Sequence, residues 1–177
     1  MMNTLLTFEF DLQKALEAII YLANKTQEQP TFMRVVKLMY LADKTSLEQY
    51  GRFISGDTYY AMKDGPVPTH TYDILKDTES NDKGFEVIHR NYPTIKVHRD
   101  ANLDYLSESD TICLDKTLAA FDHHPTWRLR EISHDEAWEA TWEEAQGNNS
   151  VIIPIQRIAD LLENSEELLD YLATQNS

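Results

Sequence analysis

The sequence predicts an α+β fold that is predominantly α-helical, with one small β-hairpin or short sheet. Apolar residues recur at helical spacing through most of the chain. Strand-like alternation is confined to one stretch, GFEVIHRNYPTIKVHRD. The 177 residues include only five glycines and six prolines, and no segment reads as a long linker. We therefore expect one globular domain over residues 1–177.

Two helices are expected in the first 51 residues. The first covers about 9–25, because four apolar residues follow one helical face: Leu12, Leu16, Ile19 and Ala23. The second opens after Pro30 and stops at Gly51, since glycine commonly ends helices. On a helical wheel, its charged residues form a stripe that we expect to face solvent: Arg34, Lys37, Lys44 and Glu48.

Asp43 does not lie in that charged stripe. On the wheel it falls between Phe32 and Val36, in the middle of the apolar face. An ionised carboxylate there costs several kcal/mol unless it is paired or well hydrogen-bonded. The nearest stretch rich in donors is YYAMKDGPVP, so Asp43 is predicted to bind a partner within residues 58–70.

The stretch ISGDTYYAMKDGPVPTHTYDILK is unusually rich in punctuating residues. ISGD predicts a turn, TYYAMKD a short extended piece, and Val67 to about Lys76 a helix with Pro68 in its first turn. The run Gly65-Pro66-Val67-Pro68 is interpreted as a stiff loop clamped by Asp43, with a glycine that permits a positive φ or a close backbone approach. A catalytic alternative is a desolvated Asp43 of raised pKa that acts as a base.

The second half of the chain predicts one hairpin and several further helices. The hairpin places 85–87 opposite 95–97. Ser107 with Asp110 forms an imperfect capping box for a helix to about residue 121. Ser133 with Glu136 forms a second box, for a helix through Trp138 and Trp142 that packs in the core or at an interface. QGNNS is expected to be a loop, and one or two acidic helices close the chain over 151–175.

The charge is acidic and unevenly distributed. The formal net charge is −14. Residues 1–100 carry 14 acidic and 12 basic side chains, whereas residues 101–177 carry 16 acidic and 4 basic ones. This balance argues against nucleic-acid binding, which depends on cationic neutralisation of phosphates. The acidic half is either a solubilising surface or a surface that attracts a basic protein partner.

The composition also bears on compartment. No apolar run approaches the roughly 20 residues that span a bilayer, and Met1-Met2-Asn3-Thr4 lacks the basic start of a secretory signal. Cys113 is the only cysteine, so no intramolecular disulfide can form. We expect a cytoplasmic protein with no membrane partner.

Neither a metal nor a cofactor is predicted. Zinc ligands on a helix usually stand four residues apart, but His134 has Trp138 at that offset. Cys113 lies between Ile112 and Leu114, which is typical of a packed apolar residue. The sequence has no G-x-S-x-G elbow, no Walker A motif and no G-x-G-x-x-G.

Three segments carry a family resemblance. KLMYLADKTSLEQYG, ISGDTYYAMKDGPVPTHTYDILK and EISHDEAW resemble, in this order, the Panacea domain of SocA-like antitoxins. The resemblance covers about 10–145 and excludes the final ~30 residues. It implies an antitoxin that neutralises a cognate protein toxin by direct binding. Some members of the family instead deliver the toxin to a protease, and some occur in prophages. The resemblance supplies no catalytic residues.

Two classes of function follow. The favoured one is a non-enzymatic antitoxin with a cognate toxin as partner and, where it acts as a proteolysis adaptor, a protease or chaperone system as a second partner. Its candidate contact residues surround the Gly65–Pro68 run: Tyr59, Tyr60, Met62, Lys63 and His70. Alternation in TYYAMKD exposes either Tyr60 and Met62 or their neighbours, and the acidic closing helices are the alternative contact surface. The other class is a small cofactor-free hydrolase that uses Asp43, Lys63 and His70.

Overall fold

The computed structural model describes residues 5–77, 83–149 and 151–175. In these ranges it is an α+β structure dominated by helices, as predicted. The helices are α1 (Leu12–Lys25), α2 (Phe32–Tyr50), α3 (Thr69–Lys76), α4 (Glu108–Phe121), α5 (Thr126–Ser133), α6 (Glu136–Ala145), α7 (Ile155–Ala159) and α8 (Ser165–Gln175), with a 3-10 turn η1 (Leu103–Tyr105). The strands are β1 (Tyr59–Met62), β2 (Gly65–Pro68), β3 (Phe85–Ile88) and β4 (Thr94–Val97). Met1–Thr4, the segment without a signal-like start, lies outside the described residues.

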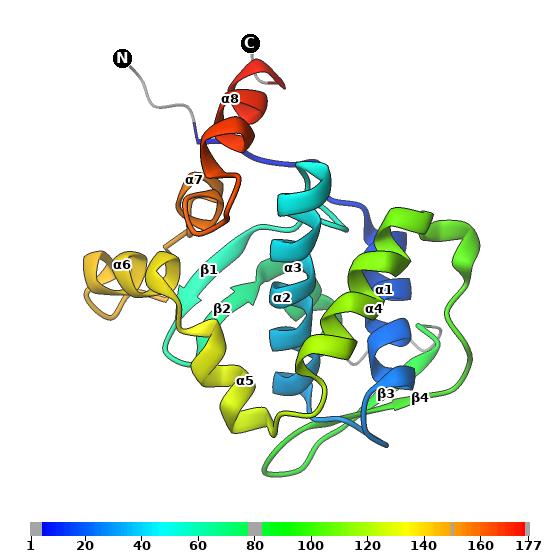
Figure 1. Cartoon of the computed structure of the whole chain (residues 1–177). Coiled ribbons are helices and arrows are strands. Elements are labelled where there is room, and N and C mark those ends of the chain that lie inside the picture. The colour runs from blue at the N-terminus through cyan, green and yellow to red at the C-terminus, as the bar shows by residue number, and fades with distance from the viewer. Residues whose placement is uncertain (1–4, 78–82, 150, 176–177) are drawn as a thin grey trace.

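Helix α2 is the central element of the fold. It packs against α1, α4, α5, α7 and β2, and Figure 1 shows it running through the middle of the molecule. The predicted solvent stripe is therefore wrong in its N-terminal half, where Arg34 and Lys37 are each only 1% exposed. Arg34 is accommodated because its guanidinium donates to the carboxylate and carbonyl of Asp122 and to the carbonyl of His124. A buried charge of this kind is tolerated when its donors are satisfied.

Two hydrophobic clusters lie on either side of α2. The first joins α1, α2, α4 and the β3–β4 hairpin, and it buries Cys113 as the sequence predicted. The second joins the C-terminal half of α2 to β1 and to α6, α7 and α8, with Trp138 in it. Tyr59 packs edge-on against both Tyr40 and Phe53 in this second cluster. These contacts position β1 against α2, the helix that carries Asp43.

The Gly65–Pro68 run forms a strand, which corrects the predicted loop and the predicted helix start at Val67. β2 pairs with β1 in antiparallel register, with Tyr59 opposite Pro68 and Met62 opposite Gly65. All four β2 residues are buried, and α3 begins only at Thr69. Proline is tolerated here because β2 is an edge strand of a two-stranded sheet. On its other edge, β1 bonds to the segment 151–153.

The remaining elements agree with the sequence in part. The hairpin is confirmed, with Phe85 opposite Val97. The capping box of Ser107 and Asp110 is also confirmed, and α4 ends at Phe121 as expected. The second predicted box is wrong. Ser133 is the last residue of α5, a helix that the sequence analysis missed, and Asp135 caps α6 instead.

The closing segment forms two short helices, α7 and α8, as one of the expected alternatives. α7 packs against α8, α6 and α2. Of the expected QGNNS loop, Gln146 and Gly147 follow α6 with positive φ values, while Ser150 lies outside the described residues. No helix in the described part of the chain is long and apolar enough to cross a membrane.

Candidate functional site

Asp43 joins α2 to the β1–β2 hairpin. Its side chain is fully buried, and it accepts 2.6 Å from the Tyr59 hydroxyl and 2.7 Å from the Ile54 backbone N–H. The predicted burial and the predicted contact within 58–70 are thus confirmed, through Tyr59. Burial raises the pKa of Asp43 to about 7, even though both hydrogen bonds oppose the shift. The two oxygens are occupied by structural donors, so the group acts as a clamp.

Asp57 performs a similar task at the start of α3. It is 2% exposed, and its carboxylate accepts from the backbone N–H groups of His70 and Thr71 and from the Thr71 hydroxyl. These are orphan donors of the first helical turn, and α3 has no side-chain cap of its own at Pro68. The imidazole of His70 also lies 2.9 Å from Asp57 through Nδ1. Asp57 therefore supplies, from 11 positions before Pro68, the cap that α3 lacks.

Lys37 joins α2 to the β1–β2 hairpin close to its turn. Its ammonium donates 3.0 Å to the Pro66 carbonyl. Burial lowers the pKa of Lys37 to about 7, with Asp64 raising it and Arg130 lowering it. Gly65 has a φ of +110°, and a Cβ on it would stand 2.8 Å from Lys37 Nζ and 2.9 Å from Ser133 Oγ. Only glycine fits this close approach.

The α5–α6 junction covers the same turn from the other side. The ring of His134 stacks on Trp138 at 3.9 Å, and Trp138 Nε1 donates 2.8 Å to the Met62 carbonyl. Burial lowers the pKa of His134. Asp135 caps α6 through the Trp138 N–H and also accepts from the Tyr40 hydroxyl. The three segments that carry the resemblance therefore meet at one place in the fold.

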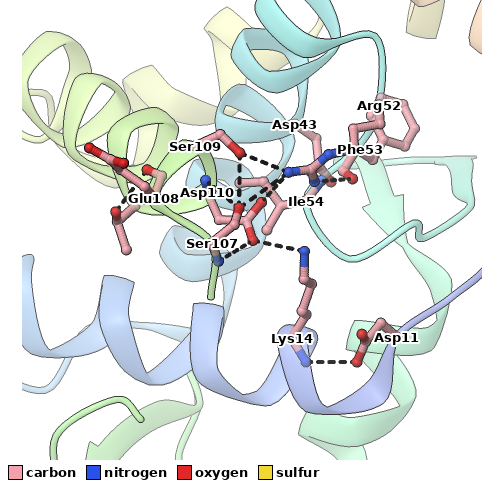
Figure 2. Close-up of polar contacts among 11 residues, drawn as sticks. Asp11, Lys14, Asp43, Arg52, Phe53, Ile54, Ser107, Glu108, Ser109 and Asp110 are labelled. Atoms are coloured by element: carbon pink, nitrogen blue, oxygen red, sulfur yellow. Dashed lines mark hydrogen bonds and ion pairs between the residues drawn. The ribbon is translucent and has the colours of Figure 1, made fainter. Parts of the chain in front are cut away.

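A second polar cluster lies at the C-terminal end of α2. Figure 2 shows Lys14 of α1 and Arg52 pointing at the buried Asp110 of α4, at 2.9 Å each. Burial by itself raises the pKa of Asp110, but the hydrogen bonds from Lys14, Ser107 and Arg52 bring it below the ordinary value. Arg52 precedes Ile54 by two residues, so this ion network also positions the backbone donor that Asp43 uses.

A pocket of about 410 Å³ opens beside the hairpin turn. Its walls come from the start of α2, the turn, α3, the β3–β4 hairpin and the segment after α6, and its lining includes the polar His89 and Asn149. Apolar side chains dominate the lining: Phe32, Met33, Val36, Met62, Val67, Tyr72, Leu75, Val87 and Pro93. The charged lining comprises three lysines and one aspartate: Lys37, Lys63, Lys76 and Asp64. This is the size and polarity of a ligand or side-chain binding pocket.

The candidate contact residues separate into four environments. Tyr59 is 1% exposed, so it contributes to the core and offers no surface to a partner. Met62 and Lys63 line the pocket. Tyr60 is half-buried and bridges to Ile152 on the other edge of β1. His70 is half-exposed and stacks on Phe10 at 4.5 Å, away from the pocket lining.

The catalytic alternative is not assembled by the described contacts. Asp43 binds Tyr59 and Ile54, His70 binds Asp57, and Lys63 lines the pocket. No contact in the described residues joins any two of the three proposed catalytic groups. Within residues 5–77, 83–149 and 151–175, no group of three or more His, Cys, Asp or Glu side chains is placed to hold a metal ion.

A family model described as the SocA-like antitoxin, Panacea domain, matches residues 35–139. The chain belongs to this family. The match begins within α2 and ends within α6, so it contains the Asp43 clamp, the β1–β2 hairpin and the α5–α6 junction. No curated protein matches the chain, and no solved structure does.

Lys37, Asp57 and Asp135 of this Panacea domain were not predicted as structural residues. Lys37 was expected to face solvent because it lies among other charged residues on the helical wheel. A wheel of one helix cannot show that a neighbouring strand covers Lys37. Asp57 gave no local signal, because it stands 11 positions before Pro68, whereas an N-cap is expected at the residue next to the helix. Asp135 stands directly before Glu136 and is as good an N-cap residue as Ser133, so the sequence offered both positions.

Proposed function

We propose that this Panacea-domain protein is an antitoxin that neutralises a cognate protein toxin by direct binding, without catalysis. Membership of the SocA-like family, over the part of the chain that builds the clamped hairpin, is the observation that carries the proposal. The hairpin supports it physically. Asp43, Lys37 and Trp138 each hold it through a hydrogen bond, so its ordering cost on binding is already met.

Two surfaces are available for the toxin. The first contains the accessible residues around the hairpin, Met62, Lys63 and His70. The second is the acidic surface of the closing helices, where Glu163, Glu166 and Glu167 are exposed. Complementary fields speed association, so a basic toxin would be attracted by the second surface whichever one forms the final contact.

The experiment that tests the proposal is co-expression with the protein encoded by the adjacent gene. The wild-type chain should restore growth of cells that express that toxin, and the two proteins should copurify. No rescue and no complex with any neighbouring product would contradict the proposal. A Lys63→Ala/His70→Ala variant and a Glu163→Gln/Glu166→Gln/Glu167→Gln variant then separate the two surfaces, since all five side chains are exposed. Thermal unfolding checks that the first variant, which loses the His70 contact with Asp57, remains folded.

A second measurement distinguishes occlusion from delivery to a protease. After toxin synthesis is stopped, the toxin half-life is followed with and without the antitoxin. Simple occlusion leaves the half-life unchanged or longer, because the complex protects the toxin. A proteolysis adaptor shortens it, and deletion of the responsible protease restores the longer half-life and the toxicity together.

A further inference from the structure

The pocket beside the hairpin turn differs in charge from the rest of the molecule. The chain carries a net charge of −14, yet the pocket lining holds Lys37, Lys63 and Lys76 against a single aspartate, Asp64. Asp64 is already paired with Arg130 at 3.0 Å. The lining is therefore cationic within an acidic protein, a local reversal that favours an anionic occupant.

The lysines differ in how far they are satisfied. Lys63 is exposed at the turn, and among the described residues it has no hydrogen-bond or ion-pair partner. Lys37 is 1% exposed, and the described residues supply its ammonium with one acceptor, the Pro66 carbonyl. An ammonium has three donors. Lys76 is occupied, by Asp73 at 3.3 Å and by the face of Tyr72. Lys63 is thus the cationic group at the pocket whose donors are accessible to an incoming carboxylate, whereas Lys37 is buried beside it.

The apolar lining defines the other half of the occupant. Val36, Leu75 and Val87 form fixed walls, whereas Met33 and Met62 are unbranched thioether side chains. Methionine adapts its shape to different partners and is common at binding surfaces that accept several side chains. Mostly apolar walls with two adaptable methionines suit a large apolar side chain of a protein segment.

From these observations we infer that the pocket receives an acidic, apolar segment of a partner protein. A large apolar side chain enters between Met33, Met62 and Val87, and a neighbouring carboxylate pairs with the exposed Lys63 at the turn. The inference deepens the proposed antitoxin function, because it names the hairpin side as the contact surface and an acidic-apolar segment of the toxin as the ligand.

The pocket is tested first without any toxin. The ¹⁵N-labelled chain is titrated with a capped peptide in which Leu-Phe is flanked on each side by two aspartates. Amide shifts are expected at Met62, Lys63, Val87 and His89. Two matched peptides serve as controls, one with lysines in place of the aspartates and one with Ser-Ser in place of Leu-Phe. Equal binding of either control, or shifts confined to other faces, overturns the inference.

Charge reversal provides the matched pair of variants. Lys63→Glu should weaken binding of the acidic peptide about five- to ten-fold, because it removes an attractive charge and adds a repulsive one. Lys116→Glu makes the same change of net charge on α4, which contributes no residue to the pocket, and should change binding less than about two-fold. Met33→Trp fills the pocket and should abolish binding of the Leu-Phe peptide while thermal unfolding stays cooperative. If Lys63→Glu and Lys116→Glu weakened peptide binding equally, the change would come from net charge alone, and the inference that the peptide binds in the pocket would be wrong.

The same variants in the co-expression assay keep the two proposals separate. If wild type fails to rescue growth, the antitoxin function fails, while the peptide titration still decides the pocket. If wild type rescues and both Lys63→Glu and Met33→Trp rescue equally well, the pocket inference fails and the antitoxin function stands. A small metabolite that occupies the pocket in place of the peptide, or a dimer that buries it, also overturns the inference.

Discussion

The Tyr59 hydroxyl donates a 2.6 Å hydrogen bond to Asp43 Oδ2, with both side chains buried. This one contact ties the central helix α2 to the first strand of the hairpin. The second Asp43 oxygen accepts from the Ile54 N–H. Three parts of the chain, namely α2, the segment after it and β1, are therefore held by one carboxylate, and the first predictions concern that group.

Replacement of Asp43 should destabilise the fold. Asp43→Ala leaves the Tyr59 hydroxyl and the Ile54 N–H buried without an acceptor, and we expect a loss of about 1–3 kcal/mol in the free energy of unfolding. Asp43→Asn keeps an oxygen acceptor and should cost less. Urea denaturation of both variants measures the difference, and an Asp43→Ala protein as stable as wild type would show that the clamp contributes nothing.

The pH dependence of stability should also report Asp43. Its folded pKa, raised to about 7, stands above the ordinary value of 3.8, so the folded state retains a proton that the unfolded state has already lost between these values. The stability from this group is present below pH 4 and is lost as pH rises toward 7. Relative to Asp43→Asn, the wild type should become progressively less stable between pH 5 and 7. A constant difference across this range would contradict the raised pKa.

The lowered pKa of Lys37 predicts that stability rises with pH at higher pH, opposite to the effect of Asp43. Its folded pKa, lowered to about 7, stands below the ordinary 10.5, so between these values the unfolded state binds the extra proton. Stability from this group should therefore rise between pH 7 and 10. The Lys37→Met variant, which keeps the length of the side chain and removes its charge, should lose that rise. Chemical denaturation of both proteins at pH 7, 8.5 and 9.5 measures it.

Gly65 should be intolerant of any side chain. Gly65→Ala forces a Cβ into a backbone of φ +110° and to within 3.0 Å of Lys37, Ser133 and His134, so we expect a loss of at least about 2 kcal/mol. Gly147→Ala is the matched control. It also has a positive φ, +86°, but a Cβ there meets nothing within 4 Å, and it should cost about 1 kcal/mol. Equal losses in thermal unfolding would assign the whole effect to the backbone angle.

Local signals in the sequence determined a large part of this structure. The amphipathic periods of α1 and α2, the glycine stop at Gly51, the capping box of Ser107 and Asp110 and the alternation of β3 and β4 each depend on residues within a few positions of one another. Such signals can be recognised in the sequence without knowledge of the tertiary structure. The buried position of Asp43 belongs with them, because a lone carboxylate in the apolar face of one helix is visible on a wheel.

Only the tertiary structure decided what covers each face. Arg34 and Lys37 looked solvent-facing because a wheel describes one helix, whereas their burial comes from β2, α5 and the turn after α4, distant in sequence. Pro66 and Pro68 looked like loop residues because proline weakens sheets in general, and they form a strand because β2 is an edge. The cationic pocket likewise exists only where α2, α3 and two hairpins converge. Burial and charge environment depend on long-range packing, and local spacing carries no record of it.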